Sequence, residues 1–121
     1  MYEIEVYEDA KGRSPIREWI RALDSAAVSD KNSGIQLRQL LYQMERLRVS
    51  GPRVGTTIAK QIDGEIWEIR PGRNRVLFAV WRENKIVLLH MFRKTTAKTP
   101  RAEIDQAKRE LRDWMTRREM K

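Results

Sequence analysis

Five residues have types and a spacing that suit chemistry on a phosphate: Lys60, Arg70, Arg73, Arg75 and His90. Arginine stays protonated and can only stabilise negative charge, whereas lysine and histidine can also transfer protons. All five lie in residues 60–101, where ten Lys/Arg accompany four carboxylates and supply +6 of the net charge of +8. Residues 1–59 and 102–121 contribute +1 each. This concentration predicts a polyanionic partner bound on one face.

Cleavage of RNA without a metal ion is a chemically sensible reaction for such a set. A base removes the 2′-hydroxyl proton, arginines stabilise the pentacoordinate phosphorane, and an acid helps the 5′-oxygen to leave. General acid–base groups typically contribute about 10²–10⁴-fold each. DNA lacks the attacking hydroxyl, so the mechanism itself selects RNA. Metal-assisted cleavage is disfavoured, because it requires two or three clustered carboxylates or histidines and the cationic face offers one of each.

The length and composition of the chain limit its class. A chain of 121 residues suits one domain, residues 1–121, with a single modest core. No cysteine is present, which excludes disulfides and thiolate metal sites and favours a reducing cytoplasm. The N-terminus has no apolar leader segment, and the apolar runs are too short to span a bilayer. We expect a cytoplasmic protein with no membrane association.

The elements that must position these residues are predicted from periodicity and turn signals. Residues 2–7 alternate with a period of two, as in a half-buried strand. Ser14-Pro15 begins a helix, and a second helix runs to about Val49. Four strands follow at residues 57–62, 66–70, 75–82 and 85–92, and Thr99-Pro100 caps a last helix. The prediction is an α+β fold, β-α-α-β-β-β-β-α, in which the helices pack on an antiparallel sheet.

Strand parity sorts the side chains of this sheet onto two faces. A two-residue turn at Glu83-Asn84 places Leu77 opposite His90 and Arg75 opposite Phe92, and a regular hairpin around the loop 71–74 places Arg70 opposite Arg75. One face then receives only apolar side chains and is expected to be the core face: Trp67, Ile69, Val76, Phe78, Val80, Val87, Leu89 and Met91. The other face receives Arg70, Arg75 and His90, with Arg73 in the adjoining loop.

Lys60, His90 and Glu68 each allow two interpretations. A strict turn at Asp63-Gly64 buries Lys60 in the core, whereas one extra bulged residue places it opposite Glu68 on the cationic face, which we prefer. Neighbouring positive charge favours the neutral, proton-accepting form of His90, although a lone histidine on a strand is more often structural. The cations could also be ordinary solvated surface, with Glu68 pairing Arg70 or Lys60.

The segment EIWEIRPGRNR (residues 65–75), followed by VLFAV, IVLLHMFRK and TTAKTP, resembles the phage-derived Gp49-like branch of the HigB/RelE toxin superfamily. The similarity covers essentially the whole chain. It implies a RelE-like fold and the toxin of a type II toxin–antitoxin pair, which inhibits translation by cleaving mRNA in the ribosomal A site. It also implies an endoribonuclease with no metal or cofactor, held in a hetero-oligomer by a co-encoded helix-turn-helix antitoxin.

The resemblance also implies roles for individual residues. Lys60 matches the lysine of the second sheet strand, and Arg75 matches the arginine that opens the next-to-last strand. Arg70 and Arg73 match the R-P-G-R motif of the branch. Catalytic roles therefore fall on Lys60, Arg70, Arg73, Arg75 and His90, and RNA contacts on Arg93, Lys94, Lys98 and Arg101. Two alternatives remain open: a non-catalytic RNA-binding or regulatory module of the same fold, and a protein that mainly binds other proteins through its amphipathic helices.

Overall fold

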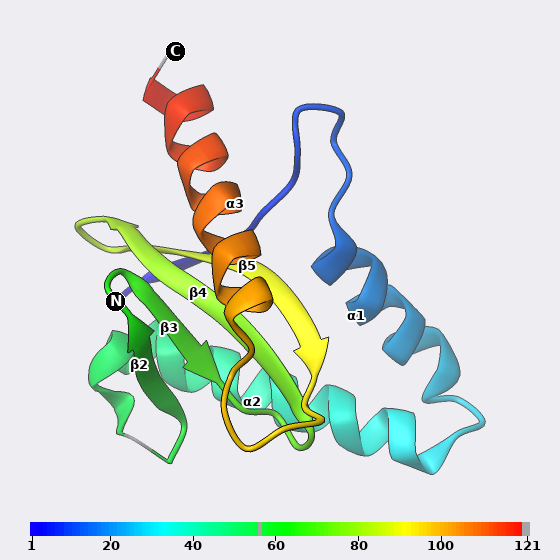
Figure 1. The fold of residues 1–121 in the computed structure, drawn as a ribbon. Helices are drawn as coiled ribbons and strands as arrows, with labels where there is room; N and C mark the ends of the chain where they lie inside the picture. The colour runs from blue at the N-terminus through cyan, green and yellow to red at the C-terminus, as the bar shows by residue number, and fades with distance from the viewer. Residues whose placement is uncertain (56, 120–121) are drawn as a thin grey trace.

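The chain forms a five-stranded sheet with helices on both faces (Figure 1). The computed structural model describes residues 1–55 and 57–119. The predicted α+β order is confirmed, with one short 3₁₀ turn, η1, added after the second helix. In chain order the elements are β1 (Glu3–Val6), α1 (Pro15–Ala26), α2 (Lys31–Ser50), η1 (Gly51–Val54), β2 (Ala59–Asp63), β3 (Ile66–Ile69), β4 (Asn74–Arg82), β5 (Lys85–Arg93) and α3 (Arg101–Glu119).

The sheet has the strand order β1-β5-β4-β3-β2 and is mixed. Strands β2 to β5 form an antiparallel meander, as the turn signals predicted. Strand β1 pairs in parallel with β5, so the expectation of a wholly antiparallel sheet is wrong in this detail. Alternation shows that a segment is a strand but carries no information on its direction. The long connection through α1 and α2 allows β1 to join the far edge in parallel.

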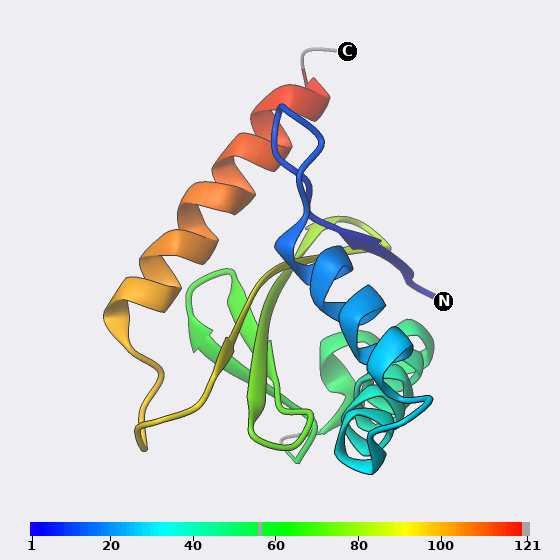
Figure 2. The same ribbon diagram turned by 90° about the vertical axis from the view of Figure 1, so that its right-hand side faces the viewer.

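The first two helices begin at residues with capping side chains. Ser14 Oγ accepts a hydrogen bond from the Arg17 amide at 3.3 Å, and Pro15 follows in the first turn of α1. Asp30 accepts one from the Asn32 amide at 3.2 Å and fixes the start of α2, which the sequence left uncertain. Helices α1 and α2 cover one face of the sheet, and α3 runs along the opposite face (Figure 2).

Both faces of the sheet carry an apolar core, although the sequence predicted an apolar core on only one face. Ile69, Val76, Phe78 and Leu88 pack toward α1 and α2. A second group packs under α3: Tyr7, Ile66, Leu77, Ala79, Val87, Leu89, Ala107, Leu111 and Trp114. The assignment of Val87 and Leu89 to the same face as Phe78 is thus wrong. Val80, also predicted in the core, is 36% exposed at the rim.

Two β-bulges in the β4–β5 hairpin explain this difference. Arg82 pairs with Lys85, but Val80 pairs with Ile86, so Trp81 is an extra residue in β4. Further along, Phe78 pairs with Leu88 and Leu77 with His90, so β5 has its own extra residue. The two bulges cancel, and the predicted pairs at the loop end, Leu77 with His90 and Arg75 with Phe92, are confirmed. The charged part of the α3 face is therefore confined to the end where β4 begins.

Candidate functional site

The buried carboxylate of Glu68 lies at the centre of the charged end of the sheet. Its side chain is 4% exposed, in the middle of β3. Oε1 lies 3.1 Å from Nε of Arg70 and 3.6 Å from Nε of Arg75. Oε2 accepts a hydrogen bond from Oγ1 of Thr99 at 2.6 Å. Three groups from three segments of the chain thus meet on one carboxylate, which is the condition for keeping a charge buried.

Arg75 is held rigidly at the start of β4. It is 9% exposed, and its Nη1 donates to the carbonyl oxygens of Gly72 at 2.9 Å and Asn74 at 2.8 Å. Burial lowers the pKa of Arg75 below its ordinary value, and the charge of Glu68 opposes this effect. An arginine remains protonated after such a shift. The tight β3–β4 loop therefore presents a fixed positive charge, which is a suitable arrangement for stabilising negative charge on a ligand.

A cavity of about 540 Å³ opens beside these groups. Glu68 is the one acid among its lining residues. Five cationic side chains also line it: Lys60, Arg70, Arg75, Lys94 and Lys98. Lys60 is there because a bulge between Gln61 and Asp63 places it opposite Glu68, as the preferred interpretation of the turn predicted. Five positive charges around one negative charge leave a net charge of +4, so the cavity is suited to an anion.

The loop between β5 and α3 forms one wall of this cavity, hereafter the cationic cavity. Lys94 and Lys98 reach it from this loop. The loop is fixed at both ends, since the Lys94 amide donates to the Arg73 carbonyl at 2.8 Å and Thr99 donates to Glu68. Arg73 is exposed and lines an adjoining hollow with Arg75 and Lys94. Five of the nine residues predicted for the site therefore line one cavity, and Arg73 lines the hollow beside it.

His90 does not line the cationic cavity. Its Nε2 lies 3.1 Å from Oε2 of Glu103 and its Nδ1 lies 3.9 Å from Oε1 of Glu110, while the ring stacks on Phe92. The sequence indicated neighbouring positive charge at His90, whereas the structure brings two carboxylates to its ring. Strand pairing alone could not reveal these carboxylates, because α3 brings both of them onto this face. His90 therefore contacts carboxylates of α3, and its predicted catalytic role remains a prediction.

Arg93 and Arg101 also lie apart from the cationic cavity. Arg93 lines a separate hollow with Arg73 and residues of α2. Arg101, at the start of α3, is 2.6 Å from Asp63 and 3.1 Å from Asp105. Contact with these two carboxylates raises the pKa of Arg101 and offsets its charge. The roles predicted for Arg93 and Arg101 in RNA binding remain predictions.

Glu68 and Thr99 are the residues of the site that sequence reasoning missed. Glu68 was considered only as a possible partner of Arg70 or Lys60, although positions 68 and 70 share a face and Arg75 follows across the turn. Thr99 was expected to cap α3, but its hydroxyl donates to Glu68. One signal in the sequence could have identified Glu68, since an acid that lies among so many cations suggests a buried counter-charge.

No group of three or more His, Asp or Glu side chains suited to a metal ion occurs within residues 1–55 and 57–119. The same residues contain no helix with an apolar stretch long enough to cross a membrane. The cations that line the cationic cavity suit it to binding a phosphate through fixed arginines, with Lys60 able to transfer a proton.

A protein-family model matches most of the chain. The model of the family described as "Phage derived protein Gp49-like (DUF891)" matches residues 18–112. That range includes all nine predicted site residues and most of the sheet. No curated protein matches the chain.

Proposed function

The chain belongs to the Gp49-like family of phage-derived proteins, and we propose that it is the toxin of a type II toxin–antitoxin pair, of the HigB/RelE type, that cleaves mRNA on the ribosome. Family membership agrees with a toxin-like protein. The observation that supports the nuclease activity is the cationic cavity, in which Glu68 holds Arg70 and Arg75 beside Lys60.

In the proposed reaction Arg75 and Arg70 bind the scissile phosphate. The side-chain nitrogen of Lys60 takes the proton of the 2′-hydroxyl, whose oxygen attacks the phosphorus. The bond from phosphorus to the 5′-oxygen breaks, and the leaving oxygen takes a proton from Lys60 or from water. The products are a 2′,3′-cyclic phosphate and a 5′-hydroxyl. No metal enters any step, and the arginines stabilise the charge that develops on the phosphorane.

A non-catalytic RNA-binding module is the second candidate, and one observation favours it. Glu68 is occupied by ion pairs with Arg70 and Arg75 and by the Thr99 hydroxyl, and His90 pairs with Glu103 outside the cationic cavity. Lysines are therefore the proton-transfer groups that remain in the cavity lining: Lys60, Lys94 and Lys98. Loss of a second general acid or base would leave RNA binding intact and slow cleavage.

Lys60→Ala separates the two candidates, because Lys60 is exposed and its removal leaves the buried ion pairs in place. Lys11→Ala is the matched control, since Lys11 is an exposed lysine in the loop before α1. The wild-type chain and the control should arrest growth and produce mRNA 5′ ends inside codons, whereas Lys60→Ala should not. Normal growth with wild-type protein, combined with salt-sensitive RNA binding, would support the module instead.

The proposal includes a protein partner. We expect a small co-encoded antitoxin with a helix-turn-helix domain, which inhibits the toxin in a hetero-oligomer in the cytoplasm. Co-expression with the neighbouring reading frame should suppress growth arrest, and the two chains should copurify. Arrest that persists despite copurification would count against inhibition by that partner.

A further inference from the structure

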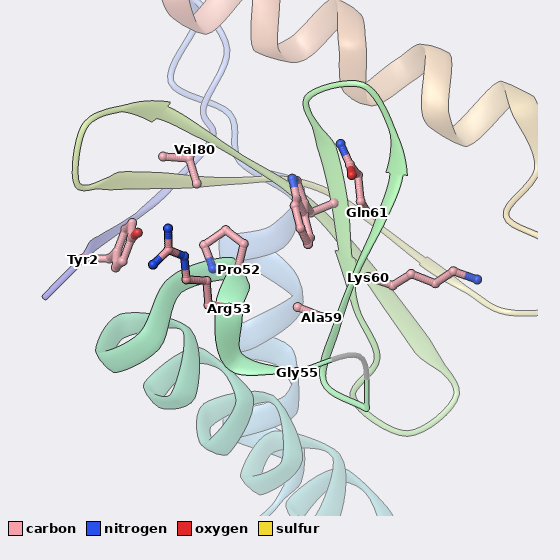
Figure 3. A pocket seen from close by; sticks show the side chains of 9 residues that line it. Tyr2, Pro52, Arg53, Gly55, Ala59, Lys60, Gln61 and Val80 are labelled. Carbon is pink, nitrogen blue, oxygen red and sulfur yellow. The ribbon is translucent and has the colours of Figure 1, made fainter.

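A second, apolar groove lies on the other side of strand β2 from the cationic cavity (Figure 3). It has a volume of about 550 Å³. Tyr2, Pro52, Trp67 and Val80 form its walls, and Arg53 is its one arginine. Strand β2 is at the edge of the sheet, so the groove is open beside it.

The groove and the cationic cavity are joined through two residues of β2. Lys60 and Gln61 line both of them. Figure 3 shows Lys60 extending away from the groove, with only the base of its side chain beside Ala59. Its pairing with Glu68 places the ammonium group on the side of the cationic cavity. A ligand that crosses β2 would therefore meet positive charges on one side and an apolar, aromatic surface on the other.

We propose that this groove binds a nucleobase of the RNA whose neighbouring phosphate occupies the cationic cavity, an inference that rests on the proposed function. A single-stranded RNA alternates charged phosphates with flat, weakly polar bases, and this alternation matches the two hollows. Bases stack on aromatic side chains regardless of sequence, and an arginine near the stack adds a cation–π contribution. Trp67 supplies the aromatic surface, and Arg53 supplies the cation.

A nucleobase fits this surface better than a segment of a partner protein. An apolar side chain of a peptide would fill the groove, but it would not by itself supply an anion to the neighbouring cationic cavity. The positive charge of Arg53 in the groove, and that of Lys60 on the neighbouring side of β2, also favour a ligand that is anionic on its flanks. The groove thus selects single-stranded RNA, since the bases of a duplex are stacked and cannot enter it.

The test uses fluorescein-labelled tetranucleotides of 2′-O-methyl RNA, which lack the attacking hydroxyl, and a series in which one position at a time is abasic. Binding is measured by fluorescence anisotropy at low ionic strength. Removing the one base that enters the groove should weaken wild-type binding about tenfold, the effect of one stacked base. Trp67→Leu should weaken binding of the complete RNA. The variant should then bind the complete RNA and that abasic RNA with equal affinity.

Val80→Glu provides a second variant, because Val80 is partly exposed and tolerates a change better than Trp67. It should reduce the preference for base-bearing RNA, whereas Val28→Glu, at a residue 91% exposed between α1 and α2, should not. If the wild-type protein binds every abasic RNA with the same affinity as the complete RNA, the groove does not bind a base. The proposed function would not be affected by that result. Failure to bind any of the RNAs would also overturn the proposed binding of a base in the groove, whereas the proposed function is judged separately by cleavage on the ribosome. Displacement of RNA from wild type, but not from Trp67→Leu, by an acidic peptide with one leucine would assign the groove to a protein partner.

Discussion

Replacing Glu68 with glutamine tests whether this carboxylate organises the site. The substitution preserves the shape of the side chain and an oxygen that can accept from Thr99. It removes the negative charge that faces Arg70 and Arg75. Because Arg75 is only 9% exposed, water cannot replace the lost counter-charge.

The expected cost follows from the burial of the three side chains. Removing one partner of a buried ion pair typically costs about 3–5 kcal/mol. Arg70 contributes little of this, since its side chain is 34% exposed and water screens it. Arg75 keeps the carbonyl oxygens of Gly72 and Asn74 as acceptors, so the low end of that range, about 3 kcal/mol, is appropriate for Glu68→Gln. This is a large fraction of the roughly 5–15 kcal/mol that stabilises a typical domain.

Urea unfolding followed by circular dichroism at pH 7 gives the free energy of unfolding for a double-mutant cycle. The cycle comprises wild type, Glu68→Gln, Arg75→Met and the double variant. Arg75→Met in the Glu68→Gln background removes the uncompensated charge and should recover part of the lost stability, giving a coupling energy of roughly 1–3 kcal/mol. Glu65→Gln is the matched control, because Glu65 is exposed, and it should stay within about 0.5 kcal/mol of wild type.

Glu68→Gln should also separate binding from catalysis. The cationic cavity becomes more positive, so RNA affinity should be maintained or increased, whereas cleavage should fall because Arg70 and Arg75 lose their anchor. A variant as stable as wild type, or a coupling energy of zero, would refute the idea that Glu68 holds the arginines in place.

Three further results are expected. Burial raises the pKa of Glu110 from 4.5 to about 7, so the folded chain keeps a proton that the unfolded chain loses as pH rises between these values, and stability falls across that window. Glu110→Gln should remove this decline and be more stable than wild type at pH 8, by about 3 kcal/mol at most, in urea unfolding curves. Thr99→Val removes the hydroxyl that donates to Glu68, and should cost about 1.5–3 kcal/mol while speeding hydrogen exchange in residues 94–100. Gly51→Ala should cost roughly 1–3 kcal/mol in thermal unfolding, because φ of +62° with ψ of −155° is accessible almost only to glycine. An added Cβ would also clash with the Tyr2 ring.

The sequence predicted the order of the elements and the register at the functional end of the sheet. Turn residues and alternation depend on neighbours along the chain, so they are visible in the sequence. The pairs Leu77 with His90 and Lys60 with Glu68 were obtained in this way. The bulges within the β4–β5 hairpin could not be predicted in this way. A compensating pair of bulges leaves the ends of a hairpin in register, and only the side chains between the two bulges change face.

The surroundings of His90 and Glu68 could not be predicted for a different reason. Both depend on where α3 and the preceding loop pack, and this is a tertiary contact between residues far apart in the sequence. Helix α3 supplies Glu103 and Glu110 to His90, and the loop supplies Thr99 to Glu68. Parity arguments place a side chain on a face, but they cannot tell what covers that face.

The chemistry of the cut ends tests the central claim most directly. Purified protein is added to translating ribosomes programmed with one mRNA, and the new ends are identified chemically, with a parallel mRNA carrying a single 2′-deoxynucleotide at the cleavage position. Attack by the 2′-hydroxyl within the cationic cavity predicts 5′-hydroxyl and 2′,3′-cyclic phosphate ends, and no cleavage at the deoxy position. Ends that carry a 5′-phosphate, or cleavage that continues at the deoxy position, would contradict the account.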